Sequence, residues 1–357
     1  MNETSEIVIS KKILKTPAKD AAKMAKAMHL QYVNDQQPGI SRKRNGDGFD
    51  YFEAGKRINN KETLARIKKL VIPPAWENVW ICQHENGHLQ VTGIDKLGRK
   101  QYRYHPAWSQ VRNLTKFFRM LDFGQQLPKI RETIQANLNL KGLPKEKVLA
   151  LVVSLLQETN IRIGNQAYEK LYGSFGLTTM KNKHVKIDGT KLVFSFKGKK
   201  GVKHNIGLKN RKLANIIKSC SDLPGKELFE FINENGEVQT IDSGMVNEFI
   251  RTIAEGEFSA KDFRTWSGSV RAIAALKEMG DYETISELNK KIPAVFDTVA
   301  GHLGNTRTVC KKYYVHPVII DLYEKKKLDS YFELNTTETN PLLSEEEHIL
   351  LNILQKQ

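Results

Sequence analysis

Alternating hydrophobic and polar positions predict strands in the first part of the chain. Residues 79–83 and 89–93 carry β-forming side chains and flank Asn86-Gly87, a pair that is typical of tight hairpin turns. Residues 71–104 are therefore expected to be mainly strands joined by turns.

Helical periodicity occupies other stretches of the chain. Small and apolar residues recur at helical spacing in residues 18–32, and the same period returns in residues 111–121 and 148–156. Glycine, proline and asparagine mark residues 37–39 and 42–48, which we expect to form loops.

A β-hairpin interrupts the helical second part of the chain. Residues 184–187 and 191–196 are predicted strands joined by an Asp188-Gly189 turn. Beyond the turn at 198–201, residues 202–208 are predicted to pair with them. A small three-stranded sheet is therefore expected among the helices.

Together these elements indicate an α+β fold with two domains and a tail. The pattern changes near Pro106, so we expect a small β-rich N-terminal domain at 1–107 and a larger, mostly helical domain at 108–334. The tail at 335–357 is acidic and carries apolar residues at helical spacing, which predicts a short docking helix. The apolar residues are Leu343, Ile349, Leu350, Ile353 and Leu354.

Charge narrows the possible partners. The 357 residues are 40% hydrophobic and 27% charged, as in a globular protein with a substantial core. The 56 lysines and arginines against 40 acidic residues give a net charge of +16, which favours nucleic acid. Basic membrane-surface and ribosome-associated proteins share this charge balance. No signal-peptide pattern or apolar run of roughly 18 residues is present, so we expect a cytoplasmic protein with no membrane partner.

Several motifs suggest cofactors but do not fit them. His84-Glu85-Asn86-Gly87-His88 matches the HExxH zinc pattern, yet it spans a predicted turn rather than a helix, so we expect an exposed hairpin there. Gly198-Lys199-Lys200-Gly201 lacks the spacing and the hydroxyl residue of a phosphate-binding loop. No acidic cluster suggests magnesium, and the three cysteines form no disulfide framework or zinc knuckle. We therefore expect no metal and no small-molecule cofactor.

Four positions remain as candidates for chemistry: Arg162, Lys199, Arg264 and one of the late tyrosines. Taken singly, each has an ordinary explanation. An arginine at a helix end is usually solvated or paired, and a lysine in a turn is usually just surface. The Tyr313-Tyr314 pair could be the edge of a core.

Together with their neighbours, these positions resemble the type IB DNA topoisomerases of the small bacterial and poxvirus kind. The matching motifs run in family order from about residue 38 to Pro317. They are Gly48–Tyr51, Ile72–Trp76, Thr92–Pro106, Arg162–Asn165, Gly173–Thr179 and Leu303–Thr306. The resemblance implies two domains that form a clamp around duplex DNA, and a monomer working in the cytoplasm at the bacterial nucleoid.

The resemblance also assigns roles. Tyr314 would be the nucleophile, Arg162 and Arg264 the catalytic arginines, and Lys199 a general acid. Two guanidinium groups suit this chemistry because they stabilise the negative charge that grows on a phosphodiester under attack. The expected product is a 3′-phosphotyrosyl enzyme with a free 5′-hydroxyl. That linkage stores the bond energy, so rejoining needs neither ATP nor metal.

Two choices near the tyrosine depend on motif register. Asn305 stands where poxvirus members carry a histidine nine residues before the nucleophile, and its amide can donate to a phosphate oxygen but carries no charge. That spacing favours Tyr314 over Tyr313. His302, one helical turn before Asn305, is a possible additional participant.

A second set of residues is expected to contact DNA. In an extended segment 99–104, Gln101 and Arg103 share one face while Tyr102 and Tyr104 share the other. Basic, polar and aromatic side chains together suit groove and phosphate contacts. With the resemblance, we expect Arg99, Gln101, Tyr102 and Tyr104 at the DNA surface.

Two other functions fit part of this pattern. A tyrosine recombinase shares the catalytic residues, but usually carries a helical domain where this chain has predicted hairpins. A non-catalytic DNA- or RNA-binding protein would explain the charge but not the four candidate residues together.

Overall fold

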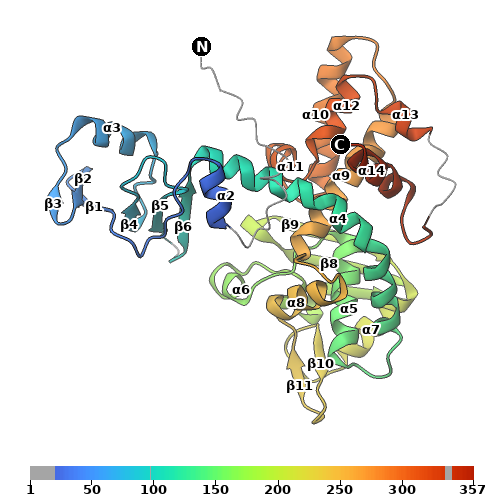
Figure 1. The fold of residues 1–357 in the computed structure, drawn as a ribbon. Coiled ribbons are helices and arrows are strands. Elements are labelled where there is room, and N and C mark those ends of the chain that lie inside the picture. Colours follow the sequence, from blue (N-terminus) through green and yellow to red (C-terminus); the bar gives the residue numbers. More distant parts are fainter. Residues whose placement is uncertain (1–20, 97, 334–339) are drawn as a thin grey trace. The chain divides into compact units, whose positions relative to one another are not determined.

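The computed structural model describes residues 21–96, 98–333 and 340–357. The chain divides into two units, Met1–Phe118 and Arg119–Gln357, drawn as a ribbon in Figure 1. The first unit is a sheet with short helices and the second is mainly helical, which confirms the α+β class. Among the described residues, no helix is long and apolar enough to cross a membrane.

A six-stranded antiparallel sheet forms the first unit, in the order β3-β2-β1-β4-β5-β6. Its strands are β1 (Ile40–Asn45), β2 (Gly48–Glu53), β3 (Lys56–Arg57), β4 (Glu77–Ile81), β5 (Leu89–Ile94) and β6 (Lys100–Tyr104). Helix α3 (Lys61–Lys69) begins at Asn60, whose side chain accepts the Thr63 N–H at 2.9 Å. Its Ile67 is buried with Ile40 and Val91 of the sheet. The predicted strands around 79–83 and 89–93 are confirmed.

One local prediction in this unit was wrong, and another gave a helix that is shorter than expected. Residues 40–45 form strand β1 rather than a loop, because pairing with β2 and β4 outweighs their basic, weakly patterned sequence. The helix expected at 18–32 is only α2 (Ala21–Ala27) within the described residues. His29 adopts a left-handed conformation with φ 56° and ends the helical turn.

The two histidines of the HExxH pattern differ in solvent exposure. His84 is exposed in the turn, as expected, but His88 is buried, which corrects the expectation of an exposed hairpin. The His88 ring stacks on Tyr32 with centroids 4.4 Å apart and meets Trp108 edge-on at 4.7 Å. Its Nδ1 accepts the Val33 N–H at 3.1 Å. His88 therefore packs as part of the core of this unit.

Buried helices organise the second unit. The long helix α4 (Pro106–Leu138) contains the last residues of the first unit and the first of the second. Helix α5 (Lys145–Thr159) is buried over most of its length because its sequence is almost continuously apolar. The predicted three-stranded sheet is confirmed as β7 (Val185–Asp188), β8 (Lys191–Lys197) and β9 (Lys203–Lys209).

Helix α9 (Ala260–Met279) packs against α10 (Ile285–Leu303), α12 (Pro317–Glu324) and α14 (Glu345–Gln355) (Figure 1). The docking helix expected in the tail is confirmed as α14, whose Ile349, Leu350, Ile353 and Leu354 are buried. Shorter elements complete the unit. They are α6 (Gln166–Tyr172), η1 (Leu177–Thr179), η2 (Asn182–His184), η3 (Lys199–Gly201), α7 (Arg211–Ser221), β10 (Glu230–Ile232), β11 (Val238–Thr240), α8 (Ser243–Ile253), α11 (Arg307–Tyr313) and α13 (Asp329–Phe332).

Candidate active site

Arg162 follows α5 on a short extended segment whose backbone is locked from one side. The Arg162 carbonyl accepts the Leu177 N–H at 2.9 Å. A β-carbon on Gly176 would stand 2.5 Å from that carbonyl, so only glycine allows this approach. Gly164 has φ +100° and packs against the same glycine. The two glycine-containing motifs of the sequence therefore fold onto each other and fix where the Arg162 side chain begins.

Arg264 lies in α9 and is only 4% exposed. Its two terminal nitrogens donate to backbone carbonyls, one to Asn160 at the end of α5 and one to Leu303 at the end of α10, the latter at 2.8 Å. Burial, together with the charge of Arg162, lowers the pKa of Arg264 to about 10. At neutral pH it therefore remains a cation, held by carbonyls rather than by a carboxylate.

Lys199 stands at the exposed tip of the β8–β9 hairpin. Gly198 donates its N–H to the Val202 carbonyl at 2.7 Å, and Lys200 takes the left-handed conformation with φ 62° that closes the turn. Desolvation and the neighbouring charge of Arg162 lower the pKa of Lys199, while Tyr314 opposes this effect. The hairpin thus brings its lysine beside Arg162 and Tyr314.

Tyr314 is the residue that ends α11, and its ring lies beneath the buried arginine. The guanidinium carbon of Arg264 is 5.5 Å from the centre of the Tyr314 ring. Tyr313 is 37% exposed and its ring lies 5.5 Å from the Lys312 amine. Of the two tyrosines, Tyr314 is therefore the one that faces the cationic cluster.

Asn305 and His302 contact different residues of the site. The Arg162 Nη2 donates to the Asn305 side-chain oxygen at 2.5 Å. The buried Asn305 Nδ2 has no hydrogen-bond partner within the described part of the chain. His302 instead places its Nε2 2.9 Å from the Asn160 side-chain nitrogen. Burial, Arg271 and Arg264 lower the pKa of His302 to about 4, so the ring is neutral.

His204 of β9 is a site residue that the sequence analysis missed. Its ring stacks on Phe196 with centroids 5.0 Å apart, directly across the β8–β9 ladder. A β-carbon on Gly198 would meet the ring at 2.7 Å, and one on Gly304 would meet it at 2.5 Å. Burial and the charges of Arg162 and Arg264 lower its pKa. His204 therefore fills the space between the hairpin and the end of α10.

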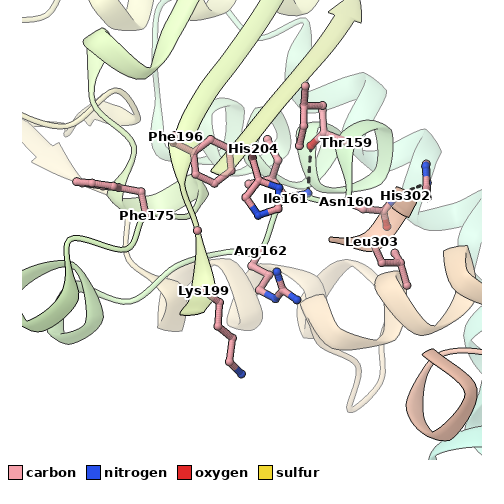
Figure 2. Close-up of a pocket in the computed structure, with 12 residues that line it drawn as sticks. Thr159, Asn160, Ile161, Arg162, Phe175, Phe196, Lys199, His204, His302 and Leu303 are labelled. Atoms are coloured by element: carbon pink, nitrogen blue, oxygen red, sulfur yellow. Dashed lines mark hydrogen bonds between the residues drawn. The ribbon is translucent and has the colours of Figure 1, made fainter. Parts of the chain in front are cut away.

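Arg162, Lys199, His204 and His302 line one pocket, shown in Figure 2. Arg264, Tyr314 and Asn305 lie outside its lining. Arg162 and Lys199 extend toward the same side of it, whereas Asn160 and His302 lie together at its other end (Figure 2). None of the described residues that line the pocket is acidic. No described cluster of histidine, cysteine, aspartate and glutamate could hold a metal ion. The cationic side chains of Arg162 and Lys199 therefore favour an anionic ligand beside them.

The residues expected at the DNA surface lie on or beside β6 in the first unit. Tyr102 and Tyr104 stack on one face with centroids 6.1 Å apart, as the extended geometry predicts. Arg99 and Gln101 both donate to the same oxygen of Asp95, at 2.7 and 2.8 Å. Tyr102 is 48% exposed, so an aromatic surface borders this polar cluster.

Comparison with known proteins adds to this geometry. Residues 105–339 match the catalytic core of eukaryotic DNA topoisomerase I, and residues 48–95 match the N-terminal domain of bacterial DNA topoisomerase IB. The chain is 32% identical over 295 residues to DNA topoisomerase 1B of Acanthamoeba polyphaga mimivirus, covering 80% of this chain and 88% of that protein. It is 26% identical over 260 residues to DNA topoisomerase 1B of vaccinia virus (strain Copenhagen), covering 70% and 77%.

A solved structure of the XerH site-specific recombinase bound to its difH substrate also matches, over 59% of this chain and 52% of that one. The TM-score is 0.34 and the identity 16%, a likeness too low to support an argument about function.

Proposed function

Because the chain belongs to the type IB DNA topoisomerases, we propose that it relaxes supercoiled duplex DNA by cutting and rejoining one strand. One observation carries the proposal. Arg162, Lys199, Arg264 and Tyr314 come from four distant segments of the chain and lie near one another. Arg162 and Lys199 line a pocket whose described lining residues include no acid, and the buried Arg264 lies over the Tyr314 ring. Such a cluster is costly for the folded protein, and a phosphodiester would complete it.

The first step is attack by Tyr314 on the scissile phosphorus. The phenol oxygen gives up its proton to solvent water and forms the new phosphorus–oxygen bond, while the bond to the 5′-oxygen breaks. Arg162 and Arg264 donate to the non-bridging oxygens as negative charge grows there. Asn305 supplies a further donor through its unpartnered Nδ2. A neutral amide at this position makes the contact weaker and less sensitive to pH than a histidinium would.

Lys199 serves as the general acid for the departing 5′-oxygen. Its place at the tip of a hairpin gives the amine reach, and its lowered pKa makes proton donation easier than from an ordinary lysine. The products are a 3′-phosphotyrosyl protein and a free 5′-hydroxyl. Rejoining reverses the same bond changes, so it draws on no ATP and no metal ion.

The first unit would supply the rest of the DNA contact. Tyr102, Tyr104, Arg99 and Gln101 form an aromatic and polar surface suited to a groove and its phosphates. We propose that both units close around duplex DNA as a clamp and that the protein works as a monomer. Sedimentation of the protein with and without a short duplex tests the monomer.

Relaxation of a supercoiled plasmid in EDTA without ATP tests the function. We expect relaxation by the wild type, none by Tyr314→Phe, and retained activity in the matched control Tyr313→Phe. A covalent DNA adduct formed by Tyr314→Phe would overturn the choice of nucleophile.

Other outcomes of the same assay favour the alternatives. Strand exchange between short target sites without relaxation would identify a tyrosine recombinase. DNA binding with neither reaction would identify a non-catalytic binding protein.

A further inference from the structure

The guanidinium of Arg264 is aimed by two backbone carbonyls rather than by an acidic partner. One carbonyl belongs to Asn160, the residue that ends α5, and the other to Leu303, the last residue of α10. The direction of Arg264 therefore depends on how these two helix ends are held relative to each other. Any movement between them would turn the guanidinium.

A side-chain contact joins the same two helix ends. The Asn160 amide meets His302 Nε2 at 2.9 Å, and His302 immediately precedes the Leu303 carbonyl that binds Arg264. Asn160 takes part with both its carbonyl and its side chain because it is left-handed, with φ 54° and ψ 19°. Asparagine tolerates this conformation better than most residues. The contact thus spans two segments that lie 142 residues apart in sequence.

The protonation of His302 suits this contact. Burial and the charges of Arg271 and Arg264 keep the ring neutral at physiological pH, since its pKa is about 4. The Arg271 Nη2 lies 3.4 Å from His302 Nδ1 and can only donate, so the ring proton belongs on Nε2. The Asn160 side-chain nitrogen faces Nε2 at 2.9 Å, and the Asn160 side-chain oxygen has no partner within the described residues. A half-turn of the amide exchanges these two atoms, so that Nε2 donates to the oxygen. Arg271 and Arg264 are the charged groups that face this ring.

We propose that His302 is a positioning residue: by binding Asn160 it fixes the two carbonyls that aim Arg264, and it makes no contact with the phosphate. The proposal rests on the proposed function, because it assigns Arg264 to the scissile phosphate. It gives His302 a role distinct from that of Asn305, which binds Arg162 directly.

Single-turnover cleavage of a DNA duplex that traps the covalent adduct tests this role. His302→Leu removes the contact while keeping an apolar side chain of similar bulk, and should slow cleavage about tenfold at unchanged DNA affinity. His302→Gln keeps a donor and should restore most of the rate. The pH–rate profile of His302→Gln should follow that of the wild type, whereas loss of a phosphate-binding histidinium would change its acidic side.

Double-mutant cycles show through which residue His302 acts. In an Arg264→Ala background, His302→Leu should cause no further loss, because its effect passes through the missing guanidinium. In the matched Lys199→Ala background it should keep its full effect. Equal tenfold losses in both backgrounds would overturn the proposal, as would an unchanged rate in His302→Leu alone.

Asn160→Gly approaches the same contact from the other side and covers the case in which His302→Leu fails to fold. Glycine accepts the left-handed conformation and keeps the carbonyl but removes the amide. It should reproduce the loss seen with His302→Leu, and a rate equal to that of the wild type would contradict the proposal. If the wild type itself forms no adduct at Tyr314, the proposed function fails. If the wild type forms this adduct, the rates of these variants test only the positioning role of His302.

Discussion

Gly268 of α9 lies against the backbone of Tyr314, since a β-carbon on Gly268 would stand 2.6 Å from the Tyr314 carbonyl oxygen. The next residue, Ser269, donates its hydroxyl to the same carbonyl at 3.3 Å and accepts the His316 N–H at 3.0 Å. The helix that carries Arg264 therefore also fixes the backbone of the proposed nucleophile.

Gly268→Ala should displace Tyr314 and slow DNA cleavage. The added methyl group must push the Tyr314 backbone away, and a shift of about 1 Å in a reacting group can cost roughly 100-fold in rate. We expect single-turnover cleavage to fall about 10- to 100-fold with little change in DNA affinity. Gly301→Ala in α10 is the control, because a β-carbon there meets no atom within 4 Å. Equal rates for the two variants would contradict the role of Gly268.

Lys199→Ala should slow cleavage about 100- to 10,000-fold, the usual contribution of a general acid. A substrate with sulfur in place of the 5′-oxygen should restore the rate, since a thiolate leaves without protonation. The pKa of Lys199 lies below its usual value of 10.5, so cleavage at low DNA concentration should decline with rising pH earlier than for an ordinary lysine. The sulfur substrate should lack this decline. A sulfur substrate that rescues nothing would argue against Lys199 as the acid.

Gln101→Ala should lower DNA affinity or site preference. Asp95→Ala should change affinity and site preference in opposite directions. Asp95 holds the side chains of both Arg99 and Gln101 through one oxygen. Removing its charge should strengthen binding at low salt but weaken site preference, because the Gln101 amide is no longer oriented. Glu278→Ala, an exposed charge of α9, is the control for charge alone. Unchanged binding by Gln101→Ala across a salt titration would refute the DNA contact.

Glu347→Ala should destabilise the second unit. This carboxylate is 6% exposed and accepts two hydrogen bonds from Arg131, each 2.7 Å, and one from Trp266 at 2.9 Å. Losing it leaves these donors buried, which should cost about 2–4 kcal/mol in the free energy of unfolding. Urea denaturation at neutral pH measures this cost. Glu345→Ala, whose side chain is exposed and pairs with Lys277, should cost far less.

The pH dependence of that stability follows from the same carboxylate. Burial is the largest single influence and raises the Glu347 pKa. The hydrogen bonds and charge of Arg131, together with hydrogen bonds from Ser344 and Trp266, outweigh burial, so the pKa lies below its usual 4.5. A lowered pKa in the folded state means the contribution is complete above the unfolded value and is lost as pH falls through the folded one. Between pH 5 and pH 3 the wild type should therefore lose more stability than Glu347→Ala.

Local sequence patterns predicted much of the fold, because each of these elements contains its own hydrophobic periodicity. The β8–β9 hairpin and helix α14 carry clear alternation or helical spacing, and both form as expected. Strand β1 could not be predicted this way, since its basic residues gain their pairing from distant β4 as well as from β2. The site positions followed from motif spacing, and their roles remain predictions.

Some parts of the site leave little trace in sequence. The carbonyls of Asn160 and Leu303 are backbone atoms, so no residue type marks them as partners of Arg264. His204 looks like an ordinary position of a half-exposed strand. The sequence analysis placed it in the predicted third strand at 202–208 without a register, and the structure pairs it with Phe196. Contacts between segments that are remote along the chain had to come from the structure.

The pocket has no acidic residue among its described lining residues, so an anionic substrate would contribute to the charge balance of the site. The charge of Arg162 lowers the pKa of both Lys199 and Arg264, and two backbone carbonyls hold the Arg264 guanidinium. In the proposed function, a bound phosphodiester would supply the missing countercharge. Repulsion among these cations lowers the free energy of unfolding of the protein without DNA. A ligand that neutralises them would therefore raise that free energy as it binds.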